Sequence, residues 1–191
     1  MAQNGACRVL VVDDEPAIRE LLSSQLEAAG FETEQAGDGL DGLMKLREKL
    51  PHVIISDLEM PRMAGSEFVA VVRQRFPQIP VFIHSGVRPS GIHQVMPDVW
   101  LQKGSTKFSA LLEAVREWTQ NPPQRSGAPL AFDAPLRARQ DGGGYVVLTC
   151  TDCLRTLAIR NDPEVKTVER TAFCDYCEAQ LKYLVESSAP D

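Results

Sequence analysis

The sequence predicts an α/β domain built on a doubly wound parallel sheet of five strands, followed by a small β-rich domain. Three observations predict this. Residues 8–118 alternate short apolar runs with longer amphipathic runs, the order of strands and helices in a parallel sheet. Several of the apolar runs end at a polar side chain, as strands do when their ends form a site. Four of the five cysteines lie in two C-x2-C pairs in the last quarter of the chain.

The five strands are short and rich in Val, Ile and Phe, which is typical of strands buried on both faces. We place them at residues 9–12, 31–36, 52–56, 80–84 and 99–102. Four helices alternate with them, at residues 16–29, 38–49, 66–76 and 105–118. Between residues 85 and 103, Pro89, Gly91 and Pro97 leave room for no more than a turn or two of a fifth helix.

The helix boundaries and faces follow from single residues. Pro16 suits a first helical turn, and Gly30 suits a helix end. Ser105 or Thr106 is expected to cap the last helix. The apolar periodicity predicts inward faces that include Leu21 in the first helix and Met44 in the second, besides the residues Ile18, Leu22, Leu26, Leu40, Leu43 and Leu46.

Polar side chains follow four of the strands. Asp13 and Asp14 follow the first, Asp57 the third, Ser85 the fourth and Lys103 the fifth. The carboxyl ends of parallel strands meet at one edge of the sheet, so these residues are expected to converge. Three carboxylates in one place repel each other, and a hard cation such as Mg²⁺ relieves that repulsion. The alternative is that each residue is an ordinary cap or turn residue.

In this site Asp57 is the candidate nucleophile toward a phosphoryl group. Asp14 and Asp57 are expected to bind Mg²⁺ directly, and Asp13 through a water molecule. Lys103 would pair with the added phosphoryl oxygens, and the hydroxyl of Ser85 would hydrogen-bond one of them.

Residues 7–119 resemble the receiver domain of two-component response regulators. The motifs that carry the resemblance are VVDDEP at 11–16, SDLEMPRMAG at 56–65, HSG at 84–86 and WLQK at 100–103. The resemblance implies a flavodoxin-like fold and phosphotransfer from a histidine kinase or phosphotransfer protein to Asp57, with Mg²⁺ bound. It also implies that Ser85 is a switch hydroxyl and Trp100 the switch aromatic. The backbone carbonyl of Glu59 falls at a metal-ligand position.

Two features depart from the family pattern. Lys103 is followed by Gly104 where the family commonly has proline, and Trp100 is larger than the usual Tyr or Phe. The segment between Ser85 and Lys103 is also shorter than usual, so the common signalling face is expected to be remodelled.

Residues 120–144 contain four prolines and four glycines, a composition that predicts a linker. The cysteines that follow, Cys150, Cys153, Cys174 and Cys177, have the spacing of a four-thiolate zinc site. Residues 145–187 therefore resemble a zinc ribbon, with strands at 145–149, 154–159, 165–171 and 181–185 and a turn at 160–163 joining the middle two. A rubredoxin-like iron site and plain dithiols or disulfides are the alternatives.

The charge favours a protein as the downstream partner. The chain carries a formal net charge of −6, and residues 141–191 hold five basic and nine acidic residues. Phosphate contacts need a positive surface, which this acidic region does not provide. A phosphorelay regulator that signals through a protein is therefore preferred, and a transcriptional regulator whose zinc ribbon binds DNA is the alternative. Tyr176 and Tyr183 are candidate anchors for a protein. We expect no enzyme activity beyond self-phosphorylation and dephosphorylation.

The location expected from the sequence is the cytoplasm. Residues 1–12 lack the pattern of a secretory signal, and no apolar run is long enough to span a bilayer. The sequence predicts neither the kinase, nor the target, nor the oligomeric state.

Overall fold

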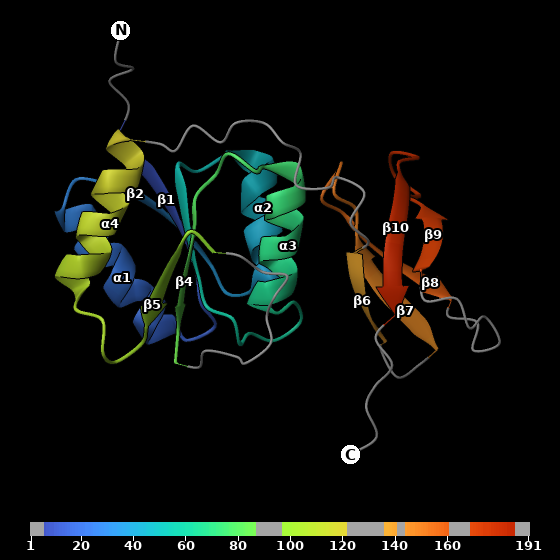
Figure 1. Ribbon diagram of the computed structural model, residues 1–191, viewed down its shortest axis with the longest axis horizontal. Coiled ribbons are helices and arrows are strands. Elements are labelled where there is room, and N and C mark those ends of the chain that lie inside the picture. Colours follow the sequence, from blue (N-terminus) through green and yellow to red (C-terminus); the bar gives the residue numbers. More distant parts are fainter. Residues whose placement is uncertain (1–5, 87–96, 122–135, 141–143, 161–168, 186–191) are drawn as a thin grey trace, which may run out of the picture. The chain divides into compact units, whose positions relative to one another are not determined.

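The computed structural model describes residues 6–86, 97–121, 136–140, 144–160 and 169–185. The chain forms two compact units, Met1–Ala128 and Pro129–Asp191 (Figure 1). Among the described residues no helix is long and apolar enough to cross a membrane. Each unit has its own sheet.

The first unit is a parallel sheet of five strands in the order β2-β1-β3-β4-β5. The strands are β1 (Arg8–Val12), β2 (Glu32–Ala36), β3 (Val53–Ser56), β4 (Val81–Ser85) and β5 (Val99–Gln102). This order confirms the predicted flavodoxin-like, doubly wound fold.

Helices cover both faces of this sheet. They are α1 (Pro16–Ala28), α2 (Gly39–Glu48), α3 (Gly65–Arg75) and α4 (Phe108–Gln120). Figure 1 shows α1 and α4 on one face and α2 and α3 on the other. The helix expected between Ser85 and Lys103 falls mainly on residues 87–96, which lie outside the described residues.

The core on the α1/α4 face is built from alternate strand positions. Val9, Val11 and Phe82 belong to one buried cluster with Leu26 of α1. Phe82 also meets Trp118 of α4 edge-on, with 6.0 Å between ring centroids. Side chains alternate between faces along a strand, so Leu10 and Ile83, also buried, serve the α2/α3 face. Truncating a fully buried ring such as Phe82 to alanine costs about 3–5 kcal/mol.

Three local predictions in this unit are wrong. Leu21 and Met44 were expected to face inward, but their exposed fractions are 54% and 56%. Each lies one residue, or about 100° around the helix, from a buried leucine and so turns to the flank. The last helix begins after Lys107 and has no side-chain cap, because the Thr106 hydroxyl already accepts a hydrogen bond from the Gln102 N–H at 2.9 Å.

The second unit is a five-stranded sheet in the order β8-β7-β6-β10-β9. Its strands are β6 (Leu136–Gln140), β7 (Tyr145–Thr149), β8 (Thr156–Arg160), β9 (Glu169–Phe173) and β10 (Gln180–Val185). β7–β8 and β9–β10 are antiparallel hairpins, and β6 lies between them, antiparallel to β7 and parallel to β10.

Two predictions for this region are corrected. Residues 120–144 were expected to be linker throughout, yet residues 136–140 form the central strand β6. Its sequence has little strand character of its own, so pairing on both edges, which no local pattern reveals, stabilises it.

The strands around 154–159 and 165–171 were expected to pair with each other across a turn at 160–163. Instead β8 pairs with β7 and β9 with β10, because each C-x2-C segment reverses the chain and brings its own flanking strands together. Of the predicted turn, residues 161–163 lie outside the described residues.

Candidate functional sites

Four of the five polar residues predicted at the strand ends come together: Asp13, Asp14, Asp57 and Lys103. Asp57 follows β3 and its N–H donates to the carbonyl of Val12, 2.8 Å away on β1. Lys103 follows β5 and its N–H donates to the carbonyl of Ser85 at 3.0 Å. These backbone hydrogen bonds between neighbouring strands fix the backbone at the strand ends that carry Asp13, Asp57, Ser85 and Lys103. Asp13, Asp57 and Ser85 are buried, and Asp14 is exposed.

Lys103 is the electrostatic centre of this site. Its Nζ lies 2.5 Å from Asp57 Oδ2, 2.9 Å from Asp13 Oδ2 and 3.3 Å from Glu15 Oε1. Burial opposes the charged form of Lys103, but its bonds to Asp57 and Asp13 outweigh burial and raise its pKa. Burial also opposes the charged form of Asp13 and so raises its pKa, although Lys103 and the Glu15 N–H act to lower it.

The carboxylates fit a hard divalent cation. Oxygens of Asp13, Asp14 and Asp57 all lie within 4.8 Å of one another. Lys103 beside them supplies one positive charge. Three carboxylates and one lysine carry surplus negative charge, which an oxygen-bound Mg²⁺ would neutralise. Glu59 is exposed and its N–H lies 3.4 Å from Asp57 Oδ1; the metal role of its carbonyl stays a prediction.

The loop after Asp57 depends on a glycine that sequence reasoning did not single out. The Leu58 N–H donates to Asp57 Oδ1 at 2.6 Å, and the Gly65 N–H donates to the Leu58 carbonyl at 2.9 Å. A Cβ on Gly65 would lie 1.8 Å from the Asp57 carbonyl oxygen. Only glycine allows α3 to begin this close to Asp57. The available signal was the glycine at the end of SDLEMPRMAG.

Arg62 is a second residue that the sequence did not flag. It has a positive φ of 58° and its guanidinium pairs with the buried Asp38 and, at 2.9 Å, with Asp41. These bonds tie the loop after β3 to the start of α2, where Asp38 is the N-cap. The loop that carries Glu59 is therefore held at both ends.

Two further predicted site residues take defined places. Ser85 is 1% exposed and its register partner on β5 is Gln102. Trp100 is half-buried and pairs in register with Ile83, on the sheet face opposite the cluster that contains Leu101. The switch roles of Ser85 and Trp100 remain predictions.

The fold and the carboxylate–lysine site define an α/β signalling domain, and comparisons with known proteins identify it. Residues 9–96 match the response regulator receiver domain family. The chain aligns with the chemotaxis protein CheY4 of Vibrio cholerae at 34% identity and a TM-score of 0.55, covering 59% of this chain and 98% of that one. It aligns with TrrA of Thermotoga maritima, solved with Mg(2+)-BeF, at 32% identity and a TM-score of 0.54, covering 58% and 97%.

Two longer relatives match over a part of their own length. A protein-glutamate methylesterase/protein-glutamine glutaminase of Anaeromyxobacter dehalogenans is 43% identical over 86 residues, 45% of this chain and 24% of that protein. The DNA-binding response regulator MtrA of Mycolicibacterium smegmatis is 41% identical over 66 residues, 35% and 29%. The chain thus spans less than a third of these relatives. It belongs to the response regulator receiver domain family.

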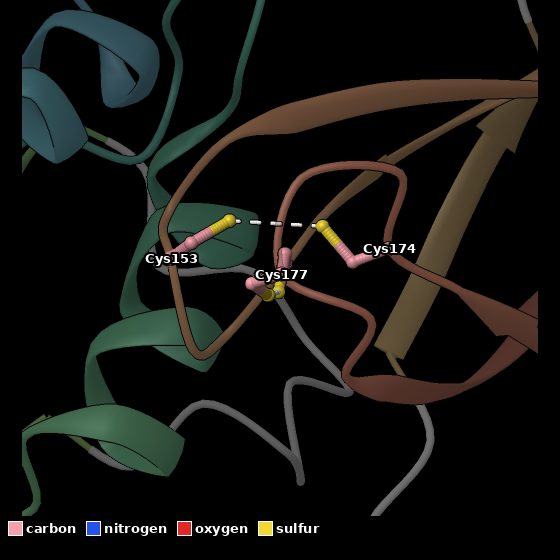
Figure 2. Close-up of side chains that lie close together, drawn as sticks. Cys153, Cys174 and Cys177 are labelled. Carbon is pink, nitrogen blue, oxygen red and sulfur yellow. Dashed lines mark hydrogen bonds between the residues drawn. The ribbon is translucent and has the colours of Figure 1, made fainter.

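The four predicted cysteines also come together. Their sulfurs lie within 4.8 Å of one another, with Cys150 to Cys177 and Cys153 to Cys174 both at 3.6 Å. Figure 2 shows the sulfurs of Cys153 and Cys174 pointing toward each other. Sulfurs around a tetrahedral zinc, with Zn–S of about 2.3 Å, are separated by about 3.8 Å. A disulfide needs about 2.05 Å, and all four thiols are free.

The two C-x2-C segments have the same backbone design. In the first, the N–H of Leu154 donates to the carbonyl of Cys150 at 2.9 Å; in the second, Glu178 donates to Cys174 at 2.9 Å. Leu154 and Glu178 both have positive φ, 57° and 62°. Each segment is a tight knuckle that turns two sulfurs to one point.

The knuckles differ in electrostatics. Burial raises the pKa of Cys150 to about 12. Burial also opposes ionisation of Cys174, but N–H groups of Tyr176 and Cys177 directed at its sulfur lower its pKa to about 7. Such N–H groups stabilise a thiolate, the form that binds metal.

Proposed function

We propose that Asp57 is the phosphoacceptor of this receiver and that the chain signals by contact with another protein. The observation that carries the first part is the Lys103–Asp57 ion pair of 2.5 Å beside the acidic pair Asp13 and Asp14. This arrangement provides a buried nucleophile, ligands for a cation and a positive charge for the incoming phosphoryl group.

In the proposed reaction a carboxylate oxygen of Asp57 attacks the phosphorus of a phosphohistidine on the kinase or phosphotransfer protein. A P–O bond forms, the P–N bond breaks, and the released imidazole takes a proton from solvent. Lys103 pairs with the phosphoryl oxygens and the Ser85 hydroxyl donates to one of them. Mg²⁺ held by Asp13, Asp14, Asp57 and the Glu59 carbonyl would supply charge neutralisation in this step.

The site is tested by labelling with acetyl phosphate in the presence of Mg²⁺. Wild-type protein should gain one phosphoryl group, detected by mass spectrometry, and Asp57→Asn should gain none. Asp152→Asn, an exposed carboxylate in the second unit, is the charge-matched control and should label like wild type. Persistent labelling of Asp57→Asn would refute the assignment of Asp57.

We propose that Cys150, Cys153, Cys174 and Cys177 hold one structural Zn²⁺. The support is a set of four free sulfurs within 4.8 Å of one another on two equivalent knuckles. Four thiolates fill a tetrahedral zinc site and leave no coordination position for a substrate, as in structural sites. Free thiols in this arrangement suit a reducing compartment, so we place the protein in the cytoplasm.

Charge supports a protein as the downstream partner. With Arg137 and Arg139 of β6 included, residues 136–191 carry seven basic and nine acidic residues. Zinc bound by four thiolates adds further negative charge, which disfavours phosphate contacts. Tyr183 is 5% exposed and belongs to the core, whereas Tyr176 is 56% exposed and available as an anchor. The similarity to the methylesterase covers too little of that protein to bring its activity here, and we propose a non-enzymatic output.

A further inference from the structure

Glu15 occupies a helix N-cap without using its side chain as a cap. It precedes Pro16 at the start of α1, and its carboxylate makes no cap hydrogen bond. N-cap carboxylates ordinarily accept N–H groups of the first turn. The Glu15 carboxylate instead lies 3.3 Å from Lys103 Nζ, on a residue 88 positions along the chain.

The backbone of Glu15 is fixed on both sides. Its N–H donates to Asp13 Oδ1 at 3.0 Å, and its carbonyl accepts from the Arg19 N–H at 3.0 Å. The Arg19 guanidinium also donates to the Asp13 carbonyl at 2.5 Å. The Glu15 carboxylate is thus presented from a rigid turn rather than from a loose one.

The three carboxylates around Lys103 differ in their surroundings. The side chains of Asp57 and Asp13 are 7% and 2% exposed, while that of Glu15 is 63% exposed. Asp57 and Asp13 therefore draw the ammonium group inward, and Glu15 draws it toward solvent. Of the three, Glu15 alone is neither the nucleophile nor a metal ligand in the proposed reaction.

We propose that Glu15 is a positioning residue that gives Lys103 a partner on the solvent side, so that Lys103 can turn from Asp57 to the incoming phosphoryl oxygens. The inference rests on Asp57 being the phosphoacceptor. With Glu15 shortened or neutralised, Lys103 loses its partner on the solvent side and stays bound to Asp57 and Asp13 alone. The nucleophile then stays paired and the phosphoryl group loses its cation, so phosphotransfer slows.

A purely electrostatic role for Glu15 predicts the opposite sign. Phosphoryl donors such as acetyl phosphate are anions, so removing a nearby negative charge would speed their reaction. A helix-capping role predicts a third pattern, because aspartate is a good N-cap residue and Glu15→Asp would preserve or improve α1.

The test is the initial rate of acetyl phosphate labelling, with Mg²⁺, in Glu15→Gln and Glu15→Asp. Glu15→Gln removes the charge, and Glu15→Asp keeps it but shortens its reach by one methylene. Both should label about two- to five-fold more slowly than wild type, the range expected for an exposed ion pair. Glu20→Gln, an exposed carboxylate on the same helix, should match wild type.

The final labelled fraction and the melting temperature separate a positioning role from a structural one. Both should equal those of wild type in the two Glu15 variants while the labelling rates fall, which a structural role would not produce. A Glu15→Gln rate at or above wild type, or a wild-type rate in Glu15→Asp, overturns the inference. Labelling that persists in Asp57→Asn would instead overturn the proposed function itself.

Discussion

The two units assemble their sites in opposite ways. The receiver site lies at the ends of strands whose sheet is buried on both faces, and Lys103 already offsets part of its negative charge. The cysteine site lies on two turns, and among the side chains that the structure describes the second unit buries only eight apolar residues, two of which are the proposed ligands Cys150 and Cys174. The proposed Mg²⁺ would therefore be an addition to the first fold, and the proposed Zn²⁺ a structural part of the second.

The largest expected effect comes from removing one of the proposed zinc ligands. Cys150→Ser should remove one Zn²⁺ per chain and unfold residues 136–185, because binding of structural zinc is worth about 10–16 kcal/mol. The receiver should keep its fold and its Asp57 labelling. Circular dichroism, metal analysis and labelling measure the three outcomes.

The control for this variant is Cys7→Ser, which removes the one cysteine outside the cluster. It should keep its zinc and its second unit. A Cys150→Ser protein that is metal-free yet has a folded second unit would show that the knuckles stand without a metal.

Gly65→Ala should have the next largest effect, confined to the receiver. The new Cβ would lie 1.8 Å from the Asp57 carbonyl, so α3 or the Asp57 loop must shift, at a cost of about 3 kcal/mol. Urea unfolding measures the loss. Gly86→Ala, whose Cβ meets nothing within 4 Å, is the matched control and should stay near wild type. Equal midpoints for both alanine variants would contradict the close approach.

The smallest expected effect is a pH dependence in the receiver. The folded-state pKa of Asp13 is raised by burial, so ionised Asp13 destabilises the fold above the ordinary carboxyl pKa. Asp13→Asn should therefore raise the urea midpoint of the receiver at pH 7 without Mg²⁺. The gain should shrink as pH falls through the raised pKa toward 3.8, the ordinary pKa of an aspartate carboxyl. A gain that is constant with pH would assign the effect to packing instead of charge.

The sequence predicted the elements and both residue sets because their signals are local. The strands of the receiver alternate with helices at the expected places. Asp57 and Lys103 were placed together because each follows a strand of one parallel sheet, and Cys150 and Cys174 because of the spacing of their C-x2-C pairs. What it missed depends on contacts distant along the chain. β6 is a strand only because β7 and β10 pair with it, and the importance of Gly65 lies in its distance from the Asp57 backbone.

Side-chain direction was the other limit. Periodicity counted Leu21 and Met44 as inward, although the neighbouring leucines alone reach the core. Likewise, the motif VVDDEP contained Glu15, but only the folded chain brings its carboxylate to Lys103. Spacing along the chain therefore predicts neither the direction of each side chain nor the charge that it meets.

The central position of β6 sets the order in which the second unit is completed during synthesis. β6 is made before both hairpins, and it gains an antiparallel neighbour at once in β7. Its other neighbour, β10, is the last strand made, and it pairs in parallel across the whole unit, Leu136 opposite Tyr183. Such long-range parallel pairing forms slowly. A chain that ends before residue 174 would have one complete hairpin, Cys150 and Cys153 without the other two cysteines, and a strand β6 whose β10 edge is open to aggregation.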